Sequence, residues 1–310
     1  MADEGHGAKA VVAAFFANLG IAIMKFIGFA FTGSGAMLAE AVHSSADTGN
    51  QLLLLLGGKK SRKSADEEHQ FGYGRERFFW AFVVAVMLFS VGALFSIYDG
   101  IEKLVHPHEL ESAQWAIGIL LGAICLEGLS FRTGIREARK VKRKTSWWRF
   151  IRTAKNPELP VVLLEDLAAL LGLAFALSAV VAADVTGDAK YDAMGSLAIG
   201  VLLGIVAVVL AIEMRSLLLG EAADPEVQQQ IAGIIADAPH VLSLIHLRTE
   251  HLGPDELLVA AKVEFSPDLT LRQLADVVND VEAAIRATVP EARVIYLEPD
   301  VTRAALAIDT

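Results

Sequence analysis

Hydrophobic residues are gathered into long runs along this chain instead of being spread evenly. A helix that crosses about 30 Å of hydrocarbon needs about 20 consecutive, mainly apolar residues. Six runs reach that length, at approximately 10–32, 36–57, 79–100, 113–132, 160–183 and 194–214. The pattern therefore predicts an α-helical membrane protein with six transmembrane helices.

Near residue 222 the long apolar runs end, and the pattern of apolar and polar residues becomes that of a soluble domain. Apolar residues at helical spacing predict the longest helix, and a Gly-Pro-Asp turn separates two β-rich segments. The expected elements, in the order helix, strand, strand, helix, strand, are Asp224–Asp237, Val241–Thr249, Leu257–Phe265, Leu269–Thr288 and Arg293–Leu297. We therefore expect a transmembrane domain over residues 1–220 and a small αββαβ, ferredoxin-like cytoplasmic domain over residues 221–310.

Composition and charge support a membrane location and indicate an orientation. Hydrophobic residues make up 54% of the chain and the mean hydropathy is +0.47, which is too apolar for an ordinary soluble protein. Lys and Arg gather in two connections, at residues 59–77 and 132–155. Short basic loops stay in the cytoplasm, so we expect both termini there, in a bacterial inner membrane. The acidic excess lies mainly after residue 220, and this charge distribution argues against a nucleic-acid partner.

Three ionisable residues interrupt the second apolar run. Glu40, His43 and Asp47 are spaced by three and four residues, so they share one face of a helix. An ionisable group inside a bilayer costs about 3 kcal/mol on insertion scales and usually serves a function. Imidazole nitrogen and carboxylate oxygen on one stripe suit a divalent transition metal. The stripe is therefore a candidate metal site.

The fifth run carries a second acidic group, Glu165 and Asp166. Adjacent side chains point about 100° apart on a helix, so at most one points directly into a site shared with the second run. Together with His43 and Asp47 these carboxylates would supply three or four ligands, and zinc commonly takes four. The alternative is that isolated polar residues form hydrogen bonds between helices.

Other polar residues in the runs have structural interpretations. Glu127, in the fourth run, lies little more than one turn from Arg132 and is expected to pair with it. Lys25, in the first run, is expected to pair or to extend its ammonium group to the interface.

Three short motifs resemble those of a known family. Residues 39–47 (AEAVHSSAD), 71–75 (FGYGR) and 191–196 (YDAMGS) resemble motifs of the cation diffusion facilitator family, whose members are proton-coupled exporters of zinc, iron and manganese. Six spans followed by an αββαβ domain match that family's architecture over nearly the whole chain. Residues 162–172 and 220–224 are similar to the subgroup related to the ninth human zinc transporter.

The resemblance implies which residues bind the metal. His43 and Asp47 match the family's ligands in the second span, and Asp166 matches one of the two ligands in the fifth. The family has His or Asp four residues before that aspartate, where this chain has Val162.

The remaining ligand stays open between Glu165, Glu40, water and none. Glu40 is also a candidate for a position behind the ligands or at the entry to the site. An oxygen-richer site would shift the preference toward Mn²⁺ or another hard ion, whereas the general order of affinities favours zinc.

The loop before the third span offers a candidate second metal site. Asp66 and His69 match two positions of a site that some relatives have, but Tyr73 stands where those relatives have His. The alternative is a solvated acidic loop.

The C-terminal domain lacks the ligands that hold zinc in relatives. The corresponding positions are Ile245, Lys262 and Tyr296. Other potential ligands, which show no spacing signature, are His240, His246, His251 and Glu298. We therefore expect a structural role for this domain, as the contact between two copies of the chain.

These features predict efflux of a divalent metal cation by exchange for protons. Zinc is the first expectation, with manganese, iron or cobalt as alternatives. Metal ligands must be deprotonated, so protons and metal compete for the same groups. The expected partners are the metal ion, protons, the lipid bilayer and a second copy of the chain. We expect no cofactor apart from the transported ion.

Other classes of function make different predictions. A non-transporting metal sensor would bind metal without any flux. A transporter of organic cations would need aromatic walls, and the second and fifth runs supply almost none. An enzyme is not expected, because no nucleophile accompanies a base at the site.

Overall fold

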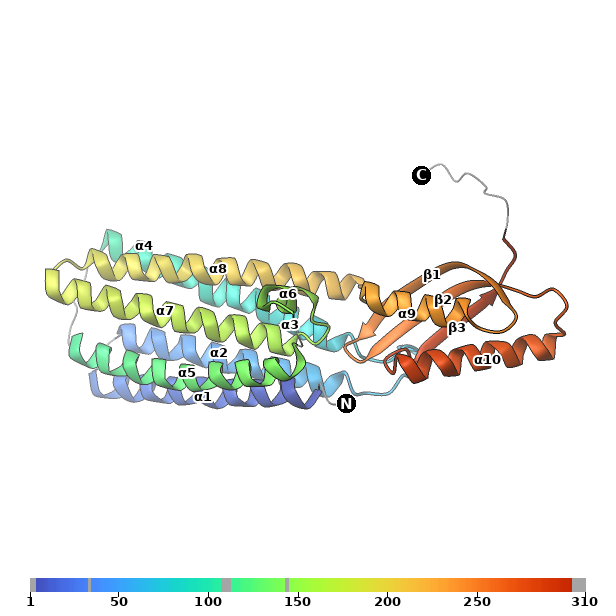
Figure 1. The fold of residues 1–310 in the computed structure, drawn as a ribbon. Coiled ribbons are helices and arrows are strands. Elements are labelled where there is room, and N and C mark those ends of the chain that lie inside the picture. The colour runs from blue at the N-terminus through green and yellow to red at the C-terminus, as the bar shows by residue number, and fades with distance from the viewer. Residues whose placement is uncertain (1–3, 33–34, 107–112, 143–144, 303–310) are drawn as a thin grey trace. The chain divides into compact units, whose positions relative to one another are not determined.

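The structure is a computed structural model that describes residues 4–32, 35–106, 113–142 and 145–302. The side chains of residues 4–6, 31–40, 42–43 and 113 lie outside the description. The chain divides into two compact units, which are traced in Figure 1. One unit comprises residues 1–64 and 76–215, and the other comprises residues 65–75 and 216–310.

The first unit consists of helices, most of them long, that run side by side (Figure 1). In chain order they are α1 (Glu4–Thr32), α2 (Gly35–Lys60), α3 (Glu76–Met87), the π-helical turn η1 (Leu88–Leu94), α4 (Phe95–Val105), α5 (Ala113–Val141), the short α6 (Trp147–Thr153), α7 (Glu158–Thr186) and α8 (Lys190–Leu219). Helices α1, α2, α5 and α7 pack together through the pairs α1–α2, α1–α5, α1–α7 and α5–α7, and α3 packs on α2.

Five helices in the described part of the chain are long and apolar enough to cross a membrane. They are α1, the continuous α3–η1–α4, α5, α7 and α8. The second expected run lies in α2, whose 26 residues include the polar stretch from His43 to Gln51. The chain is thus a multi-pass membrane protein in which five of the described helices are candidate spans, and α2 is a more polar long helix packed on α1 and α3.

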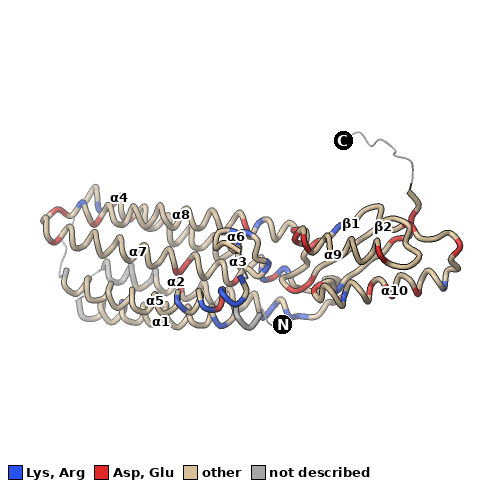
Figure 2. The backbone as a smooth tube through the Cα atoms, in the orientation of Figure 1, with Lys and Arg blue, Asp and Glu red and all other residues tan. Residues whose placement is uncertain are grey.

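Positive charge is gathered at one end of the helical unit. Lys59 and Lys60 lie in the last turn of α2, Arg139 and Lys140 lie in the last turn of α5, and α6 adds further arginines (Figure 2). At the end of α4, Lys103 Nζ lies 2.8 Å from Asp99 Oδ2 and 3.0 Å from Asp192 Oδ2 of α8. The end of the bundle that contains the last turns of α2 and α5 is therefore strongly basic.

The second unit contains helices packed on a small mixed sheet. Its elements are α9 (Pro225–Ala236), β1 (Val241–Gly253), β2 (Glu256–Phe265), α10 (Leu271–Thr288) and β3 (Val294–Pro299). The strand order is β1-β2-β3, with β1 antiparallel and β3 parallel to β2. β1 is longer than expected because its pairing continues to Gly253, opposite Glu256, on either side of a two-residue turn.

The core of this unit follows from the period-two pattern of β2. Alternate residues of this strand, from Leu257 to Val263, are buried against Ile231 and Ile235 of α9 and against Val281 and Ile285 of α10. Helix α10 begins with a capping box in which Thr270 and Gln273 each accept a backbone N–H from the other.

Candidate metal site

Asp166 of α7 is the most deeply buried of the described carboxylates in the helical unit, with no exposed surface. The hydroxyl of Ser130, on α5, donates to Asp166 Oδ2 over 2.7 Å. The Glu127 carboxyl, also on α5, lies about one helical turn before Ser130 and is close enough to Asp166 for their charges to interact. Asp166 Oδ1 is buried and has no hydrogen-bond partner among the described residues. An acceptor oxygen in that position can take a cation or a proton.

Glu165 is engaged in a different way. The side-chain amide of Asn50 donates to its Oε1 over 3.0 Å, and that of Gln51 donates to its Oε2 over 2.7 Å. Both amides belong to α2, so Glu165 ties α2 to α7 and both of its oxygens already accept a hydrogen bond. The adjacent carboxylates Glu165 and Asp166 therefore have separate sets of partners, as their 100° separation on the helix requires.

Glu127 corrects an expectation of the sequence analysis. It does not pair with the exposed Arg132 but is 1% exposed and faces Asp166 across the α5–α7 contact. A carboxylate inside an apolar run carries the same cost that marked Asp47 and Asp166 as candidates. This cost could have identified Glu127 as a candidate from the sequence, but the nearby Arg132 suggested an ion pair instead.

Asp47 of α2 completes a group of four carboxylates from three helices. Asp47 is partly buried and lies close enough to Glu127 and Glu165 for their charges to interact. Negative groups gathered in a medium of low dielectric attract a divalent cation strongly. In the described part of the chain, however, no three His, Cys, Asp or Glu side chains converge on one point as metal ligands.

Two predicted residues of the stripe fall where only the backbone is described. Glu40 and His43 belong to α2, four or more residues before Asp47, but their side chains lie outside the described part of the structure. Val162, which occupies the position of the family ligand, is fully buried at the α5–α7 contact. A Cβ placed at Gly134 of α5 would lie 4.0 Å from Val162 Cγ1. The position is therefore filled by apolar packing.

Lys25 of α1 is a buried ammonium group close to the stripe in α2. It is 6% exposed and donates to the hydroxyl of Ser44 over 2.9 Å, so it does not extend to the interface. Ser44 directly follows His43 in the sequence.

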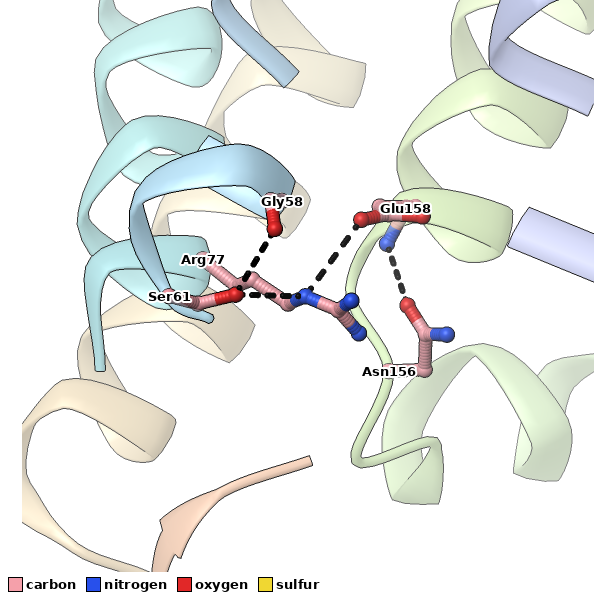
Figure 3. Close-up of polar contacts among 5 residues, drawn as sticks. All are labelled: Gly58, Ser61, Arg77, Asn156 and Glu158. Carbon is pink, nitrogen blue, oxygen red and sulfur yellow. Dashed lines mark hydrogen bonds and ion pairs between the residues drawn. The ribbon is translucent and has the colours of Figure 1, made fainter. Parts of the chain in front are cut away.

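A buried ion pair joins helices at the basic end of the unit. Arg77 Nε lies 3.6 Å from Glu158 Oε1 and 3.1 Å from the hydroxyl of Ser61, to which it donates (Figure 3). Ser61 in turn donates to the carbonyl of Gly58, and Asn156 accepts the backbone N–H of Glu158. This cluster connects the end of α2 with the first turns of α3 and α7.

The loop of residues 65–75 uses its polar groups internally. Asp66 accepts the Tyr73 hydroxyl over 2.7 Å and the backbone N–H of His69 over 2.9 Å. His69 Nδ1 lies 3.7 Å from Asp66 Oδ1, and both side chains are substantially exposed. Arg75 forms an ion pair with Glu250 of β1. Tyr73 thus supplies a hydrogen-bond donor to Asp66 where the second-site relatives have His.

The Lys262 side chain, on β2, pairs with two carboxylates of the same domain. Lys262 Nζ lies 3.0 Å from Glu298 Oε1 and 2.9 Å from Asp300 Oδ2. Hydrogen bonds to Asp300 and Glu298 raise the pKa of Lys262. Lys262 therefore binds Glu298, one of the potential metal ligands of this domain. The potential ligand His251 is buried, whereas the Tyr296 side chain is 58% exposed.

Two family models match the chain. Residues 11–219 match the model described as the cation efflux transmembrane domain, and residues 223–300 match the model described as the cation efflux protein, cytoplasmic domain. Together they include every carboxylate of the buried group and the whole three-stranded sheet.

Individual relatives are similar over most of this chain. The Mus musculus protein named Proton-coupled zinc antiporter SLC30A9, mitochondrial, is 34% identical over 271 residues, which cover 87% of this chain and 48% of that protein. The Arabidopsis thaliana protein named Metal tolerance protein C4 is 30% identical over 272 residues, covering 87% of this chain and 60% of that protein. The Klebsiella pneumoniae protein named Cation-efflux pump FieF is 29% identical over 287 residues, covering 93% and 90%. This chain thus spans about half the length of the mouse relative.

Proposed function

This chain belongs to the cation efflux family, and from that premise we propose that it exports a divalent metal cation across a membrane in exchange for protons. The observation that carries the proposal is Asp166, a fully buried carboxylate on α7 with one oxygen that lacks a hydrogen-bond partner among the described residues. Asp47 contributes a second negative charge to the same carboxylate group, from α2. The family consists of transporters, and the proposed activity is transport without catalysis of a chemical reaction.

His43, Asp47 and Asp166 are the proposed ligands of the cation. Glu165 is assigned a structural role, because the amides of Asn50 and Gln51 already occupy both of its oxygens. Glu40 is assigned a place behind the ligands or at the entry. Zinc is the proposed cargo, with manganese, iron and cobalt as further candidates. The name of the mouse relative supports zinc and proton coupling.

Exchange follows from competition between metal and protons for the same ligands. The cation would enter from the cytoplasm and bind neutral His43 with the carboxylates Asp47 and Asp166. Binding requires deprotonated ligands and therefore releases protons. After the helices expose the site to the other side, protons from that side displace the cation. Histidine suits this role because its unperturbed pKa is about 6.5. The metal must bind the two orientations with different affinities if it is to shift their balance.

The orientation and assembly are part of the proposal. The basic end of the helical unit supports a cytoplasmic location for both termini, with α2 as a sixth span (Figure 2). The match of residues 223–300 to a cytoplasmic domain supports the same side for the sheet. We assign this domain to homodimer formation, and Lys262, which occupies Glu298 and Asp300, supports a structural role over metal binding there. A bacterial inner membrane is the proposed location, and no resident cofactor is required.

Flux measured in proteoliposomes tests the proposal. Purified full-length protein would be reconstituted with an outside-to-inside pH difference and a metal-sensitive dye inside the vesicles. Wild type should move Zn²⁺ and protons in opposite directions, and His43→Ala and Asp47→Ala should abolish both movements while the protein stays folded. Stoichiometric binding without flux would favour the metal sensor instead. Wild-type flux in both variants would overturn the assigned site.

A further inference from the structure

We propose that Glu127 of α5 is a ligand of the transported cation and replaces the ligand that is missing at Val162. This inference rests on the proposed function and deepens it, because it moves one ligand from α7 to a helix that carries none of the other assigned ligands.

The position of Glu127 supports direct coordination. Its side chain is 1% exposed and lies about one helical turn along α5 from Ser130, whose hydroxyl donates to Asp166. The charged groups that face it from neighbouring helices are Asp47 on α2 and Asp166 with Glu165 on α7. Within the described residues no Lys, Arg or His forms an ion pair with Glu127. A buried carboxylate such as Glu127, with no ion pair to a basic residue, requires a bound cation or a bound proton.

Glu165, a competing candidate for the missing ligand, already has hydrogen-bond partners. Both oxygens of Glu165 accept amide hydrogens from α2. Val162 packs near Gly134 of α5, one helical turn away from the contact between Ser130 and Asp166. Glu127 lies on the other side of Ser130 along α5, so it approaches Asp166 from the side away from Val162. The proposed ligand Glu127 therefore lies at a different level along the α5–α7 pair than Val162 does.

The cation would bind between the carboxyl groups of Glu127 and Asp166, on facing sides of the α5–α7 contact. A divalent cation can bind two neighbouring carboxylate groups at once. With His43 and Asp47 the ligands become one imidazole and three carboxylates. That set is richer in oxygen than one with a second histidine, which favours harder ions such as Mn²⁺ relative to zinc.

Metal binding by the full-length protein in detergent tests this role. Zn²⁺ and Mn²⁺ affinities would be measured by competition with a fluorescent chelator for wild type, Glu127→Gln and Glu137→Gln. Glu137 is a matched control on the same helix, since it is 5% exposed and paired with Lys140 at 2.7 Å. Glu127→Gln should weaken both affinities by at least about tenfold, the lower range for groups that support a metal site. Glu137→Gln should bind as wild type does.

A second variant covers the case in which Glu127→Gln fails to fold. Glu127→His keeps a ligand at this position, and X-ray absorption of the zinc-loaded protein should then show additional imidazole scattering relative to wild type. Unchanged scattering, or wild-type affinity in a folded Glu127→Gln protein, would overturn the role of Glu127. If His43→Ala and Asp47→Ala still lose binding in that case, the proposed function stands. If wild type itself neither binds nor moves metal, the proposed function fails.

Discussion

Arg77, in the first turn of α3, forms a buried ion pair with Glu158, in the first turn of α7, with Arg77 Nε 3.6 Å from Glu158 Oε1. Their side chains are only 2% and 6% exposed, so both charges are removed from water. Ser61, beyond the end of α2, accepts a hydrogen bond from the same guanidinium. One residue pair therefore holds three helical segments together at the basic end of the unit, and two of these helices, α2 and α7, carry the proposed ligands.

Arg77→Gln should destabilise the helical unit by roughly 3–5 kcal/mol, because it removes the guanidinium that pairs with the buried Glu158 carboxylate. Thermal unfolding in detergent, followed by intrinsic fluorescence, would measure the effect. Arg62→Gln is the control, since Arg62 lies in the same connection but is exposed. The double variant Arg77→Gln/Glu158→Gln should recover part of the loss. Equal unfolding temperatures for Arg77→Gln and the control would contradict a stabilising role.

Gly57→Ala should weaken the contact between α2 and α3. A Cβ at this position would lie 2.9 Å from Trp80 Cβ, and a crowding atom so close to the helix backbone cannot rotate away. Overpacking of this kind costs about 1–3 kcal/mol. Gly49→Ala, on the same helix, meets nothing within 4 Å and should be neutral or slightly stabilising. Thermal unfolding of the two variants side by side makes the comparison, and equal stability would refute the close approach.

Glu165→Gln and Asp166→Asn should have different consequences although the residues are adjacent. Glu165→Gln would place an amide donor against the donating amide of Asn50 or Gln51, at a cost of about 1–3 kcal/mol for a buried group left without its partner. The folded fraction of this variant should keep the metal affinity of wild type. Asp166→Asn should stay folded and lose metal binding. Size-exclusion profiles combined with chelator competition would separate these effects, and a reversed pattern would exchange the two roles.

The C-terminal unit should lose part of its stability in acid through Glu264. Hydrogen bonds from Thr302 and Ser243 lower the pKa of Glu264 below its ordinary value of 4.5. A carboxylate with a lowered pKa stabilises the fold above the unfolded value, and this contribution is lost as the pH falls from 4.5 through the folded pKa.

Hydrogen–deuterium exchange of the full chain can follow this change. At pH 7, Glu264→Gln should exchange faster than wild type in peptides that cover β1 and β2. The difference at equal pH should shrink below pH 4.5. Asp268→Asn, at an exposed carboxylate shortly after β2, should match wild type throughout. A difference between Glu264→Gln and wild type that persisted unchanged into acid would contradict the assignment to the Glu264 charge.

The helices and strands could be predicted from the sequence because their signals are local. Apolar runs correspond to α1, α5, α7, α8 and the continuous α3–η1–α4, since a bilayer demands about 20 apolar residues from each span. Alternation over Leu257–Phe265 predicts β2 for the same kind of reason, because successive side chains of a strand face opposite sides. The spacing of His43 and Asp47 places them on one helix face without any knowledge of neighbouring helices.

Only the tertiary structure decided which partners these residues meet. The contact of Glu127 with Asp166 depends on the register between α5 and α7, and the amide bonds to Glu165 depend on the rotation of α7 toward α2. Neither register nor rotation is encoded in a run of apolar residues, because lipid-facing and buried apolar side chains look alike in sequence. The stripe in α2 was therefore visible from spacing alone, whereas the assignment of Glu127 on α5 to the same group of carboxylates required the packed helices.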